Sequence, residues 1–257
     1  MRELRAEWTK LRTLPSTFWL LLAAVALTVT VSAAAAAIVS CPSAGCRYDA
    51  PKIGLSGVQA GQAIVVILAV LSAGGEYGTG MIRTTLTAMP RRTAVLAAKA
   101  TLLTALTSAA GTAAVLGSVL AARLILPGNG FVPAHGYPTL SLADGPTLRA
   151  AAGSVVYLAL IALLGLGVAT AVRDSATAIG LVFGLLYVLS VLPYLVTDPY
   201  WGRFLWRISP MNAGLAVQST AHLSSLPVGP WAGLCVLAAW AGAGLLTGGL
   251  LFRLRDA

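Results

Sequence analysis

The stretch AAAGSVVYLALIALLGLGVATAV, residues 150–172, decides the fold. It holds 23 uncharged residues between Arg149 and Arg173, and polar and apolar positions do not alternate along it. Because an α-helix rises about 1.5 Å per residue, this stretch extends about 35 Å, enough to cross a hydrocarbon core of about 30 Å. The lack of alternation predicts a transmembrane helix rather than a strand of a membrane barrel.

Similar uncharged stretches recur along the chain. Together they predict six transmembrane helices, over residues 17–39, 53–75, 100–122, 150–172, 175–197 and 231–252. The composition agrees, since 58% of the 257 residues are hydrophobic and 10% are charged, whereas soluble domains carry about 25% charged residues. We therefore predict an all-α polytopic membrane protein with one transmembrane domain over residues 1–257. An ordinary soluble enzyme, a disordered protein and a nucleic-acid module are excluded.

Two other uncharged stretches have different chemistry. Residues 124–143 are rich in Pro, Gly and Asn, which predicts a loop rather than a span. Residues 208–230 mix apolar residues with Asn, Gln, Ser, Thr and His, which fits a helix on the outer surface or a re-entrant helix. A seventh span there is disfavoured, because irregular polar backbone is costly in lipid.

The formal net charge of +9 has a membrane explanation. No basic stripe with interleaved aromatic residues is present, so nucleic acid is not an expected partner. If both termini lie in the cytoplasm, 11 of the 17 Lys and Arg residues fall on the cytoplasmic side, as basic residues of membrane proteins do. Scarce Lys beside abundant Arg, Ala, Leu and Gly is typical of a GC-rich bacterial genome. We predict a bacterial plasma membrane protein with both termini cytoplasmic.

The N-terminal residues 1–14 have an amphipathic pattern. Apolar residues recur at helical spacing, at Met1, Leu4, Trp8 and Leu11, while the basic residues lie elsewhere on the helical wheel. We predict an interfacial helix on the membrane surface that contacts lipid and ends at Pro15. The alternative is a basic anchor that only sets orientation.

Cys41 and Cys46 bracket a short Pro-Ser-Ala-Gly turn in the first predicted outer loop. An oxidising outer face and a turn that lets the thiols meet favour a disulfide, and two free thiols are the alternative. A metal site is not expected, because no His or carboxylate cluster joins them. Cys235, within the last span, fits a packing role.

Motifs for catalysis are absent. The sequence contains no zinc-protease, serine-hydrolase or phosphate-binding-loop motif. Ser219, Thr220 and His222 lie close together in sequence, but no carboxylate neighbours them, so we predict no catalytic residue. The span interiors also lack an ionisable residue at mid-depth, which argues against an ion-coupled secondary transporter.

The segment between the second and third spans, GEYGTGMIRTTLTAMPRR at residues 75–92, is the most informative part of the sequence. Gly78 and Gly80 permit a break in the helix, and Pro90 ends the segment. Between them, apolar residues form one edge of a short helix, at Met81, Ile82, Leu86 and Met89. Such a helix can dock in a groove of a partner protein. The alternative is a basic inner loop that maintains topology.

This segment resembles the coupling-helix region of ABC exporter permeases, the small bacterial type-two family related to the membrane domains of white-type half-transporters. The resemblance is carried by Glu76, Tyr77, Gly80, Arg83, Arg91 and Arg92. In addition, Glu7, Trp8 and Lys10 lie where that family has a connecting helix before the first span. The layout matches as well, with an interfacial helix, six spans, and an outer segment at residues 199–229 before the last span.

The resemblance implies a permease that pairs with a second permease copy, identical or similar, and binds two ABC ATP-binding subunits. ATP and Mg would bind those subunits, and this chain would hold no cofactor. Residues 76–92 would dock in a cleft of the ATPase. The path for cargo would lie between spans 2 and 5 of both copies, with Gln59, Gln62, Val66, Tyr187 and Leu192 as facing residues. With so few charges, the path suits an amphiphilic or lipid-like cargo such as a drug, antibiotic, peptide or lipid.

The chain departs from the family pattern in two places. Residues 199–229 do not resolve into two clear re-entrant helices, and Pro193 interrupts the outer part of span 5. The rival functions are a membrane anchor or assembly factor that moves no cargo, and a secondary transporter. Two Gly-x-x-x-Gly pairs predict close helix contacts, at Gly180 with Gly184 and at Gly244 with Gly248.

Overall fold

The computed structural model describes residues 9, 15–43, 46–78 and 92–254, with side chains for all of these except 76–78, 92 and 253. Within these residues, six helical segments are long and apolar enough to cross a membrane. They are α2 (Pro15–Ile38), α4 (Val58–Gly78), α6 (Arg92–Ile125), α7 (Gly145–Val172), the α8–α9 segment, and α12 (Pro230–Leu254). The predicted all-α membrane fold with six spanning helices is confirmed.

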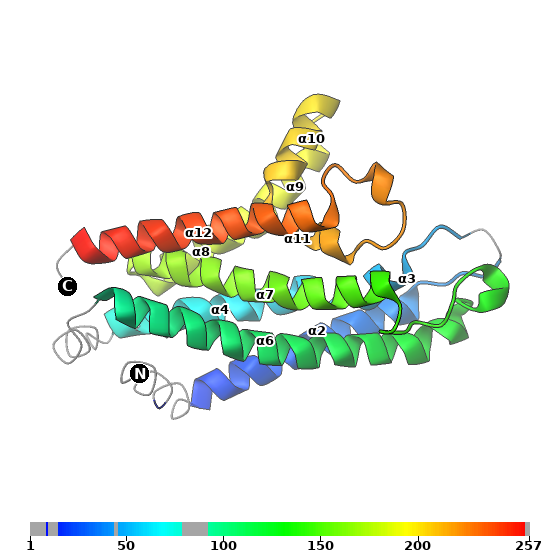
Figure 1. Cartoon of the computed structure of the whole chain (residues 1–257), viewed down its shortest axis with the longest axis horizontal. Coiled ribbons are helices and arrows are strands. Elements are labelled where there is room, and N and C mark those ends of the chain that lie inside the picture. The colour runs from blue at the N-terminus through cyan, green and yellow to red at the C-terminus, as the bar shows by residue number, and fades with distance from the viewer. Residues whose placement is uncertain (1–8, 10–14, 44–45, 79–91, 255–257) are drawn as a thin grey trace.

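Helix α7 lies at the centre of the bundle. It packs against α4, α6, α8 and α12, and Figure 1 shows it between α12 and α6. In its most apolar stretch 61% of the residues are buried, against 22% in α2 and in α12. The decisive stretch of the sequence therefore forms the helix around which the others pack.

The two ends of the bundle differ in what they contain. The loop residues 39–43 and 46–49 and the loop 126–144 lie together at one end, which we call the disulfide end (Figure 1). The start of α2 and the end of α12 lie at the opposite end, which we call the terminal end. The predicted loop at 124–143 is present at the disulfide end as two short 3-10 turns, η1 (Leu126–Asn129) and η2 (Pro133–His135), after α6 has ended at Ile125.

Helix α6 is longer than the interval between charges suggested. It covers 34 residues and includes Lys99 and Arg123, which lie outside the predicted span of residues 100–122. Lys99 is buried, and its ammonium group donates a hydrogen bond to the backbone carbonyl of Ser72 in α4 at 3.2 Å. A long Lys side chain can bury its methylene groups while its charge reaches a polar partner, so a charge does not end this helix.

The second span begins later than predicted, because residues 50–54 form a separate short helix, α3 (Ala50–Gly54). Asp49 caps α3 by accepting a hydrogen bond from the backbone N–H of Lys52 at 3.3 Å. A turn at residues 55–57 follows, and the N–H of Gly57 donates to Ser32 Oγ of α2 at 3.0 Å. Helix α4 starts only after this turn.

The fifth span is bent. It consists of α8 (Ser175–Phe183), a π-helical turn η3 (Gly184–Val188), and α9 (Leu189–Leu195), which contains Pro193. Asp174 caps the N-terminus of α8. Hydrogen bonds from Thr177, chiefly from its side chain and also from its backbone N–H, lower the pKa of the Asp174 carboxyl. Figure 1 shows α9 and the following α10 (Pro199–Ile208) leaving the bundle axis beside the start of α12.

The structure also resolves residues 208–230, which the sequence left open between two forms. Helix α11 (Pro210–Leu215) and the 3-10 turn η4 (Ala216–Gln218) return into the bundle, and nearly all of their residues are buried against α7 and α12. A second turn, η5 (Leu223–Ser225), is exposed. Helix α10, which precedes this segment, lies outside the bundle core, and α11 is the helix that returns into it.

Candidate functional site

The predicted coupling residues lie at the edge of the described chain. Helix α4 continues to Gly78, so the backbone at Glu76 and Tyr77 is helical, and α6 begins at Arg92. Both helix ends lie at the terminal end of the bundle (Figure 1). Gly80, Arg83 and Arg91 lie outside the described residues, as do the predicted connecting-helix residues Glu7, Trp8 and Lys10. Their roles stay predictions.

Two of the five predicted path residues, Gln62 and Val66, are fully buried inside this chain. The Oε1 atom of Gln62 accepts a hydrogen bond from the hydroxyl of Tyr157 in α7, and its Nε2 lies 3.3 Å from the sulfur of Met211 in α11. Gln62 thus joins α4, α7 and α11 by polar contacts in an otherwise apolar core. Both side chains are therefore shielded from solvent by other residues of the same chain.

The other three predicted path residues lie nearer the surface, and two of them are in contact. The Tyr187 hydroxyl donates to the backbone carbonyl of Gln59 at 3.0 Å, joining the π-helical turn to the start of α4. The Gln59 side chain is exposed, and Leu192, about one turn beyond Tyr187, is 37% exposed. The structure therefore brings Gln59 and Tyr187 together, and their role in a path stays a prediction.

The disulfide end has its own small core. A disulfide joins Cys41 and Cys46, whose Cα atoms are 5.9 Å apart. Cys41 is fully buried and belongs to a hydrophobic cluster with Ala36, Ala122 and Phe131. The backbone N–H of Cys41 donates a hydrogen bond to the carbonyl of Asn129 at 2.8 Å. The predicted bond is present and closes the first loop on itself, while the hydrogen bond from Cys41 joins that loop to η1.

We expect the thiol count to reflect this bond. The denatured protein should react with one equivalent of a maleimide before reduction, at Cys235, and with three afterwards. Intact-mass spectrometry measures both numbers. A Cys235→Ser variant is the control and should show none before reduction and two after. Three reactive thiols in the protein that has not been reduced would contradict the disulfide.

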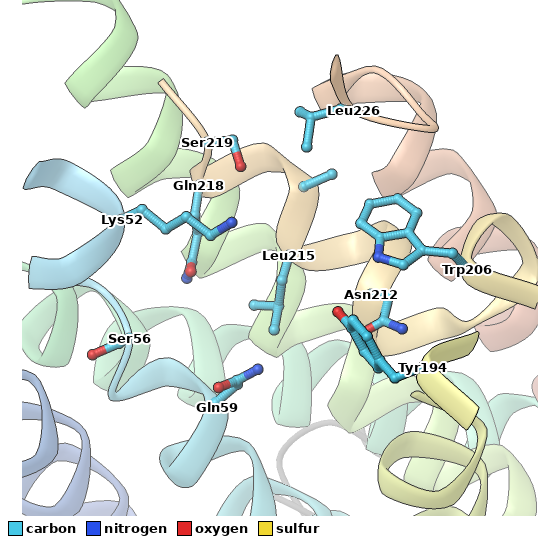
Figure 2. Close-up of a pocket in the computed structure, with 11 residues that line it drawn as sticks. Lys52, Ser56, Gln59, Tyr194, Trp206, Asn212, Leu215, Gln218, Ser219 and Leu226 are labelled. Atoms are coloured by element: carbon cyan, nitrogen blue, oxygen red, sulfur yellow. The ribbon is translucent and has the colours of Figure 1, made fainter. Parts of the chain in front are cut away.

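A polar cavity of about 160 Å³ lies near the disulfide end, and no pattern in the sequence predicted it. Three segments far apart in the chain surround it, namely α3 with the start of α4, α9 with α10, and α11 with the turn that follows it (Figure 2). Its polar lining includes Lys52, Gln59, Tyr194, Asn212 and Ser219. A cavity of this size has room for about ten water molecules. We call it the Lys52 cavity.

Hydrogen bonds hold the wall of the Lys52 cavity in place. Asp49 accepts from Thr220 N at 2.6 Å, from Thr220 Oγ1 at 2.7 Å and from Ala221 N at 2.9 Å. Arg149 of α7 donates from Nη2 to the carbonyl of Ser219 at 2.7 Å. Because Asp49 also caps α3, one carboxylate fixes both the helix that bears Lys52 and the loop that bears Ser219.

The charge of the cavity is positive. Lys52 is the one charged residue among the eleven described residues that line it, and none of these is Asp or Glu. The apolar part of the lining includes Leu215, Leu226 and the indole of Trp206. The cavity therefore combines one cation, several uncharged polar groups and an apolar side.

Comparison with known proteins identifies no relative: no protein-family model matches the chain, and no curated protein matches it.

Proposed function

We propose that this chain is the membrane-spanning permease subunit of an ATP-driven exporter, working as a dimer with two separate ABC ATP-binding subunits. The observation that carries the proposal is the sequence of residues 76–92, with Glu76, Gly80 and Arg83 spaced as in the coupling helix of that family. The arrangement of six spanning helices, with residues 79–91 connecting α4 to α6, is compatible with this role. ATP hydrolysis belongs to the partner.

Helix α4 offers a direct mechanical connection. It is continuous from Val58 to Gly78 and therefore about 30 Å long. One end leads into the proposed coupling segment, and the other bears Gln59, which is bonded to Tyr187 of the bent fifth span. A push on residues 79–91 would move α4 as a rigid rod and would shift its contact with that bend. In this proposal, closure of the ATPases reaches the disulfide end by that route.

The proposed path suits an amphiphilic or lipid-like cargo. Helix α4 has a single charged residue, Glu76 near its end, and the fifth span from Ser175 to Leu195 has none. Polar but uncharged groups, such as those of Gln59 and Tyr187, can bind a polar head group without the cost of an unpaired charge in the membrane.

Co-purification tests the proposed function. The tagged chain is extracted from native membranes in a mild detergent, and the proteins that elute in near-equal amounts are identified by mass spectrometry. We expect an ABC ATP-binding subunit. A chain that elutes alone or with an unrelated protein would contradict the proposal and would favour the membrane anchor or the secondary transporter.

The coupling role of Glu76 gives a prediction of its own. In proteoliposomes containing the complex, Glu76→Ala should lower ATP-driven efflux of a fluorescent amphiphile at least tenfold while ATP hydrolysis and co-purification of the ATPase persist. The reason is that the carboxylate is expected to anchor the coupling helix to the end of α4. Glu76→Asp, which keeps the charge, is the matched control and should retain most efflux. Unchanged efflux in Glu76→Ala would exclude this role.

A further inference from the structure

We propose that the Lys52 cavity binds the head group of an anionic amphiphile, an oxyanion such as a phosphate ester with an apolar body attached. The proposal concerns binding, so it holds whether or not the chain exports anything.

Hydrogen-bond donors converge on the cavity from separate elements. Figure 2 shows the Lys52 ammonium group, the Gln59 amide and the Tyr194 hydroxyl directed toward the same space from α3, α4 and α9. Oxyanions accept several hydrogen bonds at once, and those from an ammonium group are the strongest. No described lining residue is acidic, so a cationic or amine-bearing ligand would meet Lys52 with nothing to balance it.

Ser219 adds an observation that is independent of the charge. Its side chain is 3% exposed and lines the cavity, and its hydroxyl is buried without a hydrogen-bond partner among the described residues. Buried hydroxyl groups are nearly always paired, with protein groups or with ordered water. The backbone of Ser219 is fixed on both sides, since its N–H donates to the Ala216 carbonyl and its carbonyl accepts from Arg149. The hydroxyl is therefore held ready for a ligand oxygen.

The neighbouring carboxylate does not cancel the positive charge by direct pairing with Lys52. Asp49 is outside the cavity lining, and its two oxygens already accept hydrogen bonds from Lys52 N, Thr220 and Ala221. Asp49 therefore holds α3 and the loop after η4 together by hydrogen bonds, and the Lys52 ammonium group faces the cavity.

The apolar side of the cavity selects an amphiphile over a free ion. Leu215, Leu226 and Trp206 line it together with the donors. Binding sites for small molecules combine apolar walls with a few placed polar groups in this way. A free phosphate ion would use the donors and gain nothing from these walls, whereas an alkyl phosphate would use both.

Binding of three probes to the purified protein in dodecyl maltoside tests the proposal, measured by native mass spectrometry and calorimetry. The probes are dodecyl phosphate, inorganic phosphate and dodecyltrimethylammonium, which has the same chain with a cationic head. We expect one dodecyl phosphate per chain, at least tenfold tighter than either other probe. Displacement of dodecyl phosphate by phosphatidylglycerol would identify a membrane lipid as the natural occupant. Failure of phosphatidylglycerol to displace dodecyl phosphate would point to a single-chain amphiphile. Either result supports the site.

Matched variants locate the binding. Lys52→Gln should weaken binding of dodecyl phosphate at least tenfold, and Ser219→Ala severalfold. Arg47→Gln removes the same charge from an exposed residue at the same end but outside the cavity, and it should bind as the parent does. Equal binding in Lys52→Gln and the parent, an equal loss in Arg47→Gln, or inorganic phosphate binding as tightly as dodecyl phosphate would overturn the proposal. If Lys52→Gln does not fold, Ser219→Ala alone decides between these outcomes.

Discussion

Gly167→Ala should lower the thermal midpoint of the purified protein in detergent by about 4–8 °C. A Cβ atom at this position of α7 would lie 2.4 Å from the backbone carbonyl carbon of Gly244 and 2.6 Å from the N of Leu245 in α12. Backbone atoms cannot move aside as a flexible side chain can, so the two helices must separate. Overpacking of this kind costs about 2 kcal/mol, which corresponds to that shift for a chain of this size.

Gly180→Ala is the matched control. It is also a helical glycine, but a Cβ atom there meets nothing within 4 Å among the described residues. Both substitutions lower the conformational entropy of the unfolded chain, which stabilises a helix by about 0.5–1 kcal/mol. The difference between the two variants therefore isolates the contact between α7 and α12. Equal thermal midpoints for Gly167→Ala and Gly180→Ala would contradict the close approach of these helices.

The same glycines show how far the sequence could predict packing. The pair Gly180 and Gly184 matches a spacing for close helix contact, yet within the part of the chain that the structure describes a Cβ atom on either would meet nothing within 4 Å. The pair Gly244 and Gly248 does lie against α7, where a Cβ atom on Gly248 would come within 2.5 Å of the Gly167 carbonyl. Gly167 belongs to neither pair. The spacing of glycines shows that one face of a helix is lined by small residues. Whether another helix packs against that face depends on the position of the partner helix, which the spacing does not give.

The number of spans could be predicted, because hydrophobic length depends on local sequence alone. The ends of the spans could not, because they depend on contacts between helices. Lys99 lies inside α6 since its ammonium group reaches the Ser72 carbonyl of α4. The start of the second span is divided into α3 and α4, and the intervening turn bonds to Ser32 of α2.

The candidate sites differ in the same way. The disulfide was predictable, because Cys41 and Cys46 are neighbours in sequence with a turn between them. The Lys52 cavity was not, because Lys52 and Ser219 come from opposite parts of the chain and are brought together by Asp49 through Thr220 and Ala221. No local pattern marks such a site.

Gln62 and Tyr157 provide the second large effect. Replacing either partner alone, as Gln62→Leu or Tyr157→Phe, leaves a polar group buried without its partner. We expect each single substitution to cost about 1–3 kcal/mol. The double variant should cost less than the sum of the two, by about 1 kcal/mol, as measured coupling energies in membrane helices suggest. Unfolding in mixed micelles, followed by tryptophan fluorescence, measures all four proteins of the cycle. Strictly additive costs would contradict the hydrogen bond.

Cysteine labelling decides which face of α4 serves the proposed path. Gln59 and Gln62 are three residues apart, so they point to adjacent parts of the helix surface, yet Gln59 is exposed and Gln62 is buried against α7 and α11. In a background without other free thiols, Gln59→Cys should react with a water-soluble maleimide and Gln62→Cys should not. If both react while the ATPase turns over, α4 must separate from α7 during transport. The hydrogen bond between Gln62 and Tyr157 is then broken in each transport cycle. If only Gln59→Cys reacts throughout, the path follows the Gln59 and Tyr187 side of α4, and Gln62 belongs to the fixed core.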